Sequence, residues 1–200
     1  MQNQDRVKFI DVMKALGIIA IVLGHTIVQD GNIIGNALSA FKVPIFFLTS
    51  AMVMNVEKPY KQFVMNRFLK LLVPYYGVSL ISILIYVVIG SKLLPSTPPP
   101  PRELSVMYNL TGMIYANARK GGMNWNRTLW FLPCLFACTL LTLFIEKVFI
   151  HEKQSRRIAS MIFSAFSGYV LASFYPGIFF PFQIETAINM MVWMELGVFL

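Results

Sequence analysis

The chain has 200 residues, of which 56% are hydrophobic and only 13% charged, and its mean hydropathy is +0.63. Soluble domains carry about 25% charged residues, because they need a polar surface around their core, so the composition excludes a soluble globular domain. We attribute the net charge of +8 to Lys and Arg at a membrane surface, and we expect no nucleic-acid partner.

Six apolar runs divide the chain into membrane-spanning and connecting segments. A helix needs about 20 mainly apolar residues to cross the hydrocarbon core of a bilayer. We therefore expect an all-α, polytopic bundle of transmembrane helices that forms a single membrane-embedded domain over residues 1–200. The last run reaches the end of the chain with no charged residue behind it, which predicts a domain incomplete at its C-terminus. The runs cover residues 9–28, 33–54, 71–90, 128–145, 158–175 and 186–200.

The basic residues of the connections predict a cytoplasmic N-terminus. Lys and Arg are enriched in cytoplasmic connections, and short connections carry most of this signal. With the N-terminus inside, ten basic residues fall on the cytoplasmic side and five on the other, and those five all belong to one long connection. The ten are Arg6, Lys8, Lys58, Lys61, Arg67, Lys70, Lys147, Lys153, Arg156 and Arg157.

The long connection over residues 91–127 is expected to lie on the extracytoplasmic side. It begins with a proline-rich stretch at 95–101, which favours a stiff, extended backbone, and it continues with a predicted interfacial helix at 104–116. Loops of this length are usually functional lids or disordered segments. A functional lid and a solvated spacer both remain open.

Cys134 and Cys138 are the two cysteines of the chain and lie four residues apart inside an apolar run. Two such residues do not make a disulfide framework or a thiolate metal site. We expect both side chains to be packed between helices, and no metal is expected.

The first span carries three ionisable residues, Asp11, Lys14 and His25. Such groups are costly in a bilayer and are therefore functional candidates by default. At 100° per residue, Lys14 lies within about 20° of His25 around the helix and Asp11 within about 40°. Along the axis Lys14 and His25 are about 16 Å apart. A local Asp11–Lys14 ion pair and a hydrogen-bonded structural histidine are the alternatives, although histidine suits proton transfer near neutral pH.

Two other spans and one connection also carry charged residues that are candidates. Lys42 precedes Pro44, which should bend the second helix. Arg67 and Lys70 share a helix face, so they could bind one polyanion or merely anchor the cytoplasmic end of a span. Glu195 falls in the last run, where we expect its partner to lie beyond the end of the chain.

Four segments, in order, resemble the acyltransferase-3 family of integral membrane O-acyltransferases, in particular its sugar O-acetylase branch. The family's opening Asp-x-x-Lys/Arg motif, followed by a histidine at the far end of the same helix, is similar to residues 9–25. Its Phe-His-Met-Pro-Leu-Phe-Phe segment, its Arg-x-x-Arg motif before a proline and its Leu-Trp-Phe-Leu signature are similar to residues 41–50, 67–74 and 129–133.

The chain departs from the family pattern at three positions. Lys42 replaces a histidine, Ala51 a glycine and Lys70 the second arginine of the Arg-x-x-Arg motif. Lysine keeps the charge at position 70 but lacks the guanidinium fork that suits phosphate. Family members also have more spans than six, which again predicts an N-terminal fragment.

The resemblance implies an acyltransferase that takes acetyl from cytoplasmic acetyl-CoA. The acceptor would be a hydroxyl of a cell-envelope or surface-polysaccharide sugar, which makes the partners an acyl-CoA, a carbohydrate and the lipid bilayer. The implied location is the bacterial inner membrane. His25 would be the catalytic base and Asp11 would fix Lys14, while Lys14, Arg67 and Lys70 would hold the phosphates of the donor.

A different class of function fits the same residues. Histidine and charged side chains along one helix face also occur in proton-coupled transporters and flippases of polar or lipid-linked substrates. Dependence on acetyl-CoA would favour the enzyme, and flux of an unmodified substrate would favour the transporter. A purely structural membrane anchor would explain the composition but not the buried charges.

Overall fold

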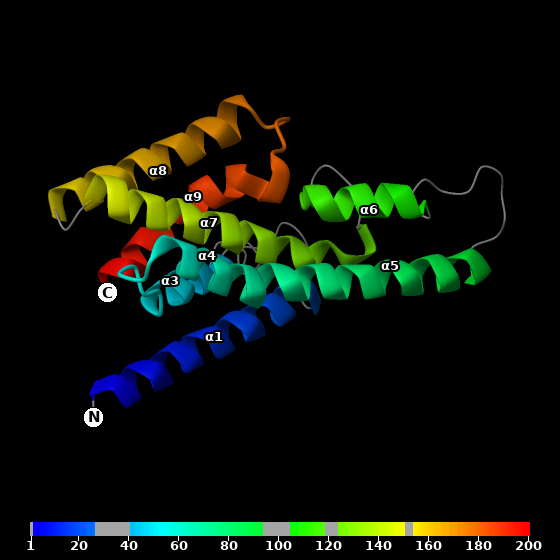
Figure 1. Cartoon of the computed structure of the whole chain (residues 1–200), viewed down its shortest axis with the longest axis horizontal. Coiled ribbons are helices and arrows are strands. Elements are labelled where there is room, and N and C mark those ends of the chain that lie inside the picture. Colours follow the sequence, from blue (N-terminus) through cyan, green and yellow to red (C-terminus); the bar gives the residue numbers. More distant parts are fainter. Residues whose placement is uncertain (1, 27–40, 94–104, 119–123, 151–153) are drawn as a thin grey trace. The chain divides into compact units, whose positions relative to one another are not determined.

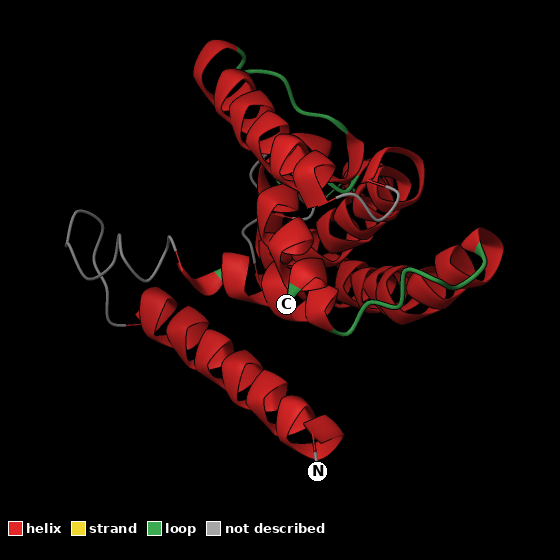
Figure 2. Ribbon diagram, turned by 90° about the vertical axis from the view of Figure 1, so that its left-hand side faces the viewer, coloured by secondary structure: helices red, strands yellow, loops and turns green. Residues whose placement is uncertain are grey.

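The computed structural model describes residues 2–26, 41–93, 105–118, 124–150 and 154–200, and within these ranges the chain forms helices and loops but no strand (Figure 2). This confirms the expected all-helical class. The α-helices are α1 (Gln2–Thr26), α3 (Pro44–Met52), α4 (Tyr60–Arg67), α5 (Val73–Leu93), α6 (Val106–Tyr115), α7 (Phe131–Ile145), α8 (Gln154–Phe174) and α9 (Ile184–Phe199).

Shorter helical segments of other types lie between some of these helices. Two are π-helical, η1 (Phe68–Leu72) and η4 (Glu146–Ile150), and two are 3₁₀-helical, η3 (Asn124–Trp130) and η5 (Pro181–Gln183). A π-helical segment inserts a wider turn into an α-helix and is often found at functional sites.

Three helices in the described part of the chain are long and apolar enough to cross a membrane. They cover Tyr60–Ile89, Asn126–Ile150 and Ser155–Phe174, with lengths of 30, 25 and 20 residues. These helices support a multi-pass membrane protein. The count of six spans and the cytoplasmic N-terminus stay predictions, and residues 27–40 of the first two predicted spans lie outside the described residues.

The helix that contains the third predicted span begins earlier than residue 71. It starts at Tyr60, directly after Pro59, and continues through η1 into α5. Arg67 and Lys70 are therefore inside this helix and not in the preceding connection. A membrane helix can continue through Lys and Arg residues that lie near its terminus, because their long side chains can reach back to the interface.

The chain forms two compact units, and the first comprises residues 1–56, 142–166 and 190–200. Helix α3 is its centre, with Phe47 and Thr49 fully buried. Two glycines allow other helices to approach α3 closely. A Cβ atom on Gly17 of α1 would lie 2.7 Å from Phe46 Cε2, and one on Gly197 of α9 would lie 2.3 Å from the Leu48 carbonyl oxygen.

The second unit comprises residues 57–141 and 167–189. Helix α6 packs against α5 (Figure 1), and the hydroxyl of Tyr75 donates a hydrogen bond to the Met113 carbonyl at 2.8 Å. The helix predicted at 104–116 is thus confirmed as α6. Its N-cap is Ser105, whose hydroxyl accepts a hydrogen bond from the backbone N–H of Tyr108.

The two cysteines are free thiols buried inside this second unit. The Cys138 thiol donates to the Ala187 carbonyl at 3.3 Å, and the Cys134 thiol to the Gln183 carbonyl at 3.8 Å. Both side chains therefore pack between helices, as predicted. Pro44 is the first residue of α3, directly after a turn at Val43, so the predicted interruption of the second helix is also confirmed.

Candidate functional site

Helix α1 carries Asp11, Lys14 and His25 on one continuous rod of 25 residues. His25 is its penultimate residue, and the helical rise places it about 16 Å beyond Lys14. The face of α1 with Ile10, Gly17 and Ala20 is buried. Lys14 lies beside this face and is partly buried.

The alternative in which Asp11 and Lys14 form a local ion pair is not realised. Both side chains belong to the described part of α1, and no ion pair within 4.0 Å joins them. Asp11 is exposed, whereas Lys14 is partly buried. The ammonium group of Lys14 is therefore available to an anionic ligand.

Arg67 and Lys70 belong to the other unit, where α4 passes into the π-helical turn η1. The guanidinium carbon of Arg67 lies 5.3 Å from the centre of the Phe63 ring, which is a cation–π distance. Lys70 is exposed. Among the residues that the structure describes, no carboxylate lies within 4.0 Å of either cation.

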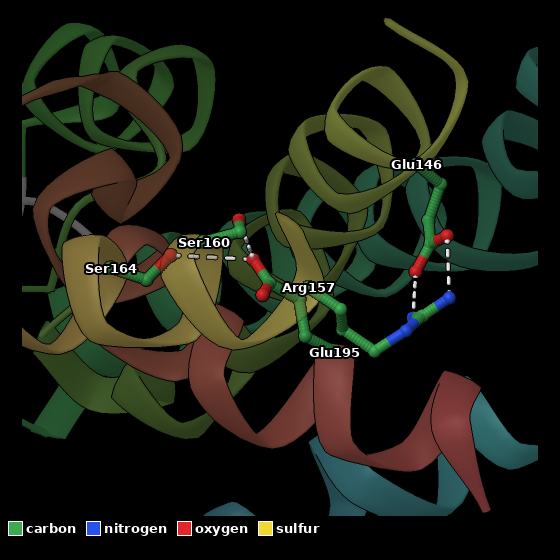
Figure 3. A network of polar contacts seen from close by, with 5 residues as sticks. All are labelled: Glu146, Arg157, Ser160, Ser164 and Glu195. Carbon is green, nitrogen blue, oxygen red and sulfur yellow. Dashed lines mark hydrogen bonds and ion pairs between the residues drawn. The ribbon is translucent and has the colours of Figure 1, made fainter. Parts of the chain in front are cut away.

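A polar network in the first unit was not predicted as a whole. Arg157 of α8 donates from both terminal nitrogens to the two carboxylate oxygens of Glu146, with Nη2 to Oε2 at 3.0 Å (Figure 3). Ser160 and Ser164, on the next turns of α8, donate to Oε1 of Glu195 at 2.8 and 3.4 Å.

Ser160 and Ser164 provide hydrogen-bond partners for Oε1 of Glu195 from within the chain, whereas a partner beyond residue 200 stays a prediction. These serines are three and seven residues after Arg157, which is the spacing of one helix face. That spacing was the available signal in the sequence. The pairing of Arg157 with Glu146 had no such signal, because it joins two different helices.

The remaining predicted position, Lys42, is partly buried and immediately precedes the turn at Val43. The structure thus places three of the predicted site residues on α1 and two at the junction of α4 and η1. These two groups belong to different units of the chain.

The helices that could span a membrane are typical of an integral membrane protein. Some ionisable residues of the chain are half-buried or fully buried, which is typical of a polar site in such a protein. The model of the acyltransferase domain family Acyl_transf_3 matches residues 7–200, which is nearly the whole chain. The chain belongs to this family of membrane acyltransferases, whose activity requires an acyl donor. No curated protein and no solved structure matches the chain.

Proposed function

We propose that this protein moves an acetyl group from cytoplasmic acetyl-CoA to a hydroxyl of a cell-envelope or surface-polysaccharide sugar. The observation that carries the proposal is helix α1, which presents Asp11, Lys14 and His25 along a single helix within the matched family domain. One helix thereby provides a cation at its middle and an imidazole near its C-terminal end.

His25 is the proposed general base. Its neutral imidazole takes the proton of the acceptor hydroxyl while the hydroxyl oxygen attacks the carbonyl carbon of the thioester. A new C–O bond forms, the C–S bond breaks, and the departing CoA thiolate receives the proton. This direct transfer needs no serine or cysteine nucleophile, which agrees with the hydrogen-bonded, buried state of Cys134 and Cys138.

Lys14, Arg67 and Lys70 are the proposed ligands of the donor's phosphates. Arg67 and Lys70 fit this role because neither is neutralised by a carboxylate among the described residues. Charge-assisted hydrogen bonds to phosphate are among the strongest in proteins. Asp11 is proposed to orient Lys14 when the donor is bound. It lies one helical turn away, but no ion pair joins the two described side chains in the ligand-free structure.

The proposed location is the bacterial inner membrane, with the N-terminus in the cytoplasm. The cations at the start of the Tyr60–Ile89 span then face cytoplasmic acetyl-CoA. The connection over residues 91–127 then faces the extracytoplasmic acceptor. The described helix of this connection, α6, packs against α5, and its role as part of a lid or a spacer stays open.

The decisive experiment compares His25→Ala and His25→Gln in the purified, membrane-reconstituted chain. Acetyl transfer from labelled acetyl-CoA to extracted envelope glycans is measured per inserted molecule. We expect both variants to lose about 10²–10⁴-fold in turnover, the usual contribution of a positioned base, and to retain acetyl-CoA binding. Glutamine can donate a hydrogen bond but cannot accept the proton.

The second histidine of the chain, His151, provides the matched control, and His151→Ala should keep parental turnover. Near-parental turnover of His25→Gln would remove His25 from the mechanism. Transport of an unmodified glycan that does not require acetyl-CoA would show that the protein is a proton-coupled transporter and not an acetyltransferase.

A further inference from the structure

Glu195 is a carboxylic acid with no contact to water inside the first unit. Its exposed fraction is 0%, and those of Ser160 and Ser164 are 3% and 2%. Both serine hydroxyls donate to Oε1 (Figure 3), whereas Oε2 has no hydrogen-bond partner in the described part of the chain. Such an orphan atom in a native protein calls for an explanation.

The charges around Glu195 do not balance if every group is ionised. Among the described residues, the charged groups within electrostatic reach are Glu146 and Arg157. Arg157 already forms a two-point ion pair with Glu146, and serine hydroxyls bring no charge. Helix α3, which packs against α9 at Gly197, has no charged residue between Pro44 and Met52. In the described part of the chain, the cation within reach of Glu195 is therefore already paired with another carboxylate.

Glu195 is also closed off from solvent in the described structure. Its exposed fraction is 0%. Gly197, two residues later on α9, packs so closely against α3 that a Cβ atom would lie 2.3 Å from the Leu48 carbonyl oxygen. A buried group that cannot be paired or hydrated becomes neutral instead.

We propose that Glu195 holds a proton, and that it forms with Ser160 and Ser164 a buried proton-binding site between α8 and α9. The proton sits on Oε2, where it converts the unpartnered carboxylate oxygen into a neutral hydroxyl. The serine hydroxyls hold Oε1 as the carbonyl oxygen. The site does not depend on the proposed acetyl transfer, because it involves none of the residues assigned to that reaction.

Infrared spectroscopy of the whole chain in lipid nanodiscs at neutral pH tests the site directly. The wild-type protein should show the C=O stretching band of a protonated carboxylic acid. That band should disappear in Glu195→Gln and remain in Glu57→Gln, a control variant that removes an exposed carboxylate. Absence of the band from the wild-type protein would show that Glu195 is ionised and would overturn the proposal.

The abundance of inserted protein, compared between Glu195→Gln and Glu146→Gln, provides a second measurement. Glutamine resembles a neutral acid, so Glu195→Gln should remain within about twofold of the wild type. Glu146→Gln leaves Arg157 without its counter-ion and should fall more than about tenfold. Equal losses in both variants would contradict a neutral Glu195. A sodium ion as the ligand would also contradict the proposal. In that case sodium chloride would stabilise the wild type more than choline chloride does, and this difference would be absent in Glu195→Gln.

Discussion

Two charged stretches of this protein each adjoin a π-helical turn, yet they differ in how their cations are satisfied. At η1, the described Arg67 and Lys70 have no carboxylate within 4.0 Å, and Arg67 stacks on Phe63. At η4, Glu146 binds both terminal nitrogens of Arg157. In the first stretch no described carboxylate pairs with the cations, whereas in the second stretch the cation forms an ion pair within the fold.

This difference supports the proposal that the first stretch binds a ligand and the second stabilises the fold. Cations without a counter-ion weaken a fold, and proteins keep such arrangements mainly at functional sites. The Arg67–Lys70 stretch also resembles the Arg-x-x-Arg motif of the family, whereas Arg157 lies within the matched domain but outside the four segments with a recognisable motif. We therefore expect the first stretch to affect donor use and the second to affect stability.

The largest effect is expected at the ion pair. Arg157→Ala leaves Glu146 as an uncompensated buried charge, which typically costs 3–5 kcal/mol, so little inserted protein should remain. Arg67→Ala is the matched change in the other stretch and should keep near-parental abundance. Inserted protein is quantified by fluorescence-detected gel filtration of detergent extracts. Comparable losses in the two variants would abolish the distinction between the stretches.

A smaller effect is expected on the use of acetyl-CoA. Arg67→Ala and Lys70→Ala each remove a charge-assisted hydrogen bond to phosphate, worth about 1.5–3 kcal/mol. The acetyl-CoA concentration for half-maximal rate should rise at least about tenfold, while the dependence on acceptor glycan stays the same. Lys70→Arg should match or improve on the parent, because a guanidinium binds phosphate at two points. An unchanged dependence on acetyl-CoA in both alanine variants would reduce these residues to membrane anchors.

The least perturbing test concerns the side of the membrane that the two stretches are predicted to share. Reporter fusions at Lys58 and after Arg157 should report the cytoplasm, and a fusion at Pro99 should report the exterior. The reason is the concentration of basic residues in the short connections. A cytoplasmic signal at Pro99 would reverse the orientation and exchange the proposed donor and acceptor sides.

The all-helical class, the membrane location and the family were within reach of the sequence. Apolar run length and charge content determine whether a helix can cross a bilayer, and these are local properties. The sequence also located the break at Pro44 and helix α6. The helix of the third predicted span begins at Tyr60, so Lys61, Arg67 and Lys70 belong to it, whereas the start of the span itself at residue 71 stays a prediction.

Side-chain pairing required the tertiary structure. The sequence alone marked Asp11, Lys14 and Glu195 as costly charges, because their cost in an apolar environment depends only on their type and position. Only packing decided that Asp11 and Lys14 do not pair, that Arg157 belongs to Glu146, and that Glu195 is held by two serines of α8. Each of these outcomes depends on which helix faces meet, and such meetings join residues far apart in the sequence, as where Gly17 of α1 and Gly197 of α9 both approach α3.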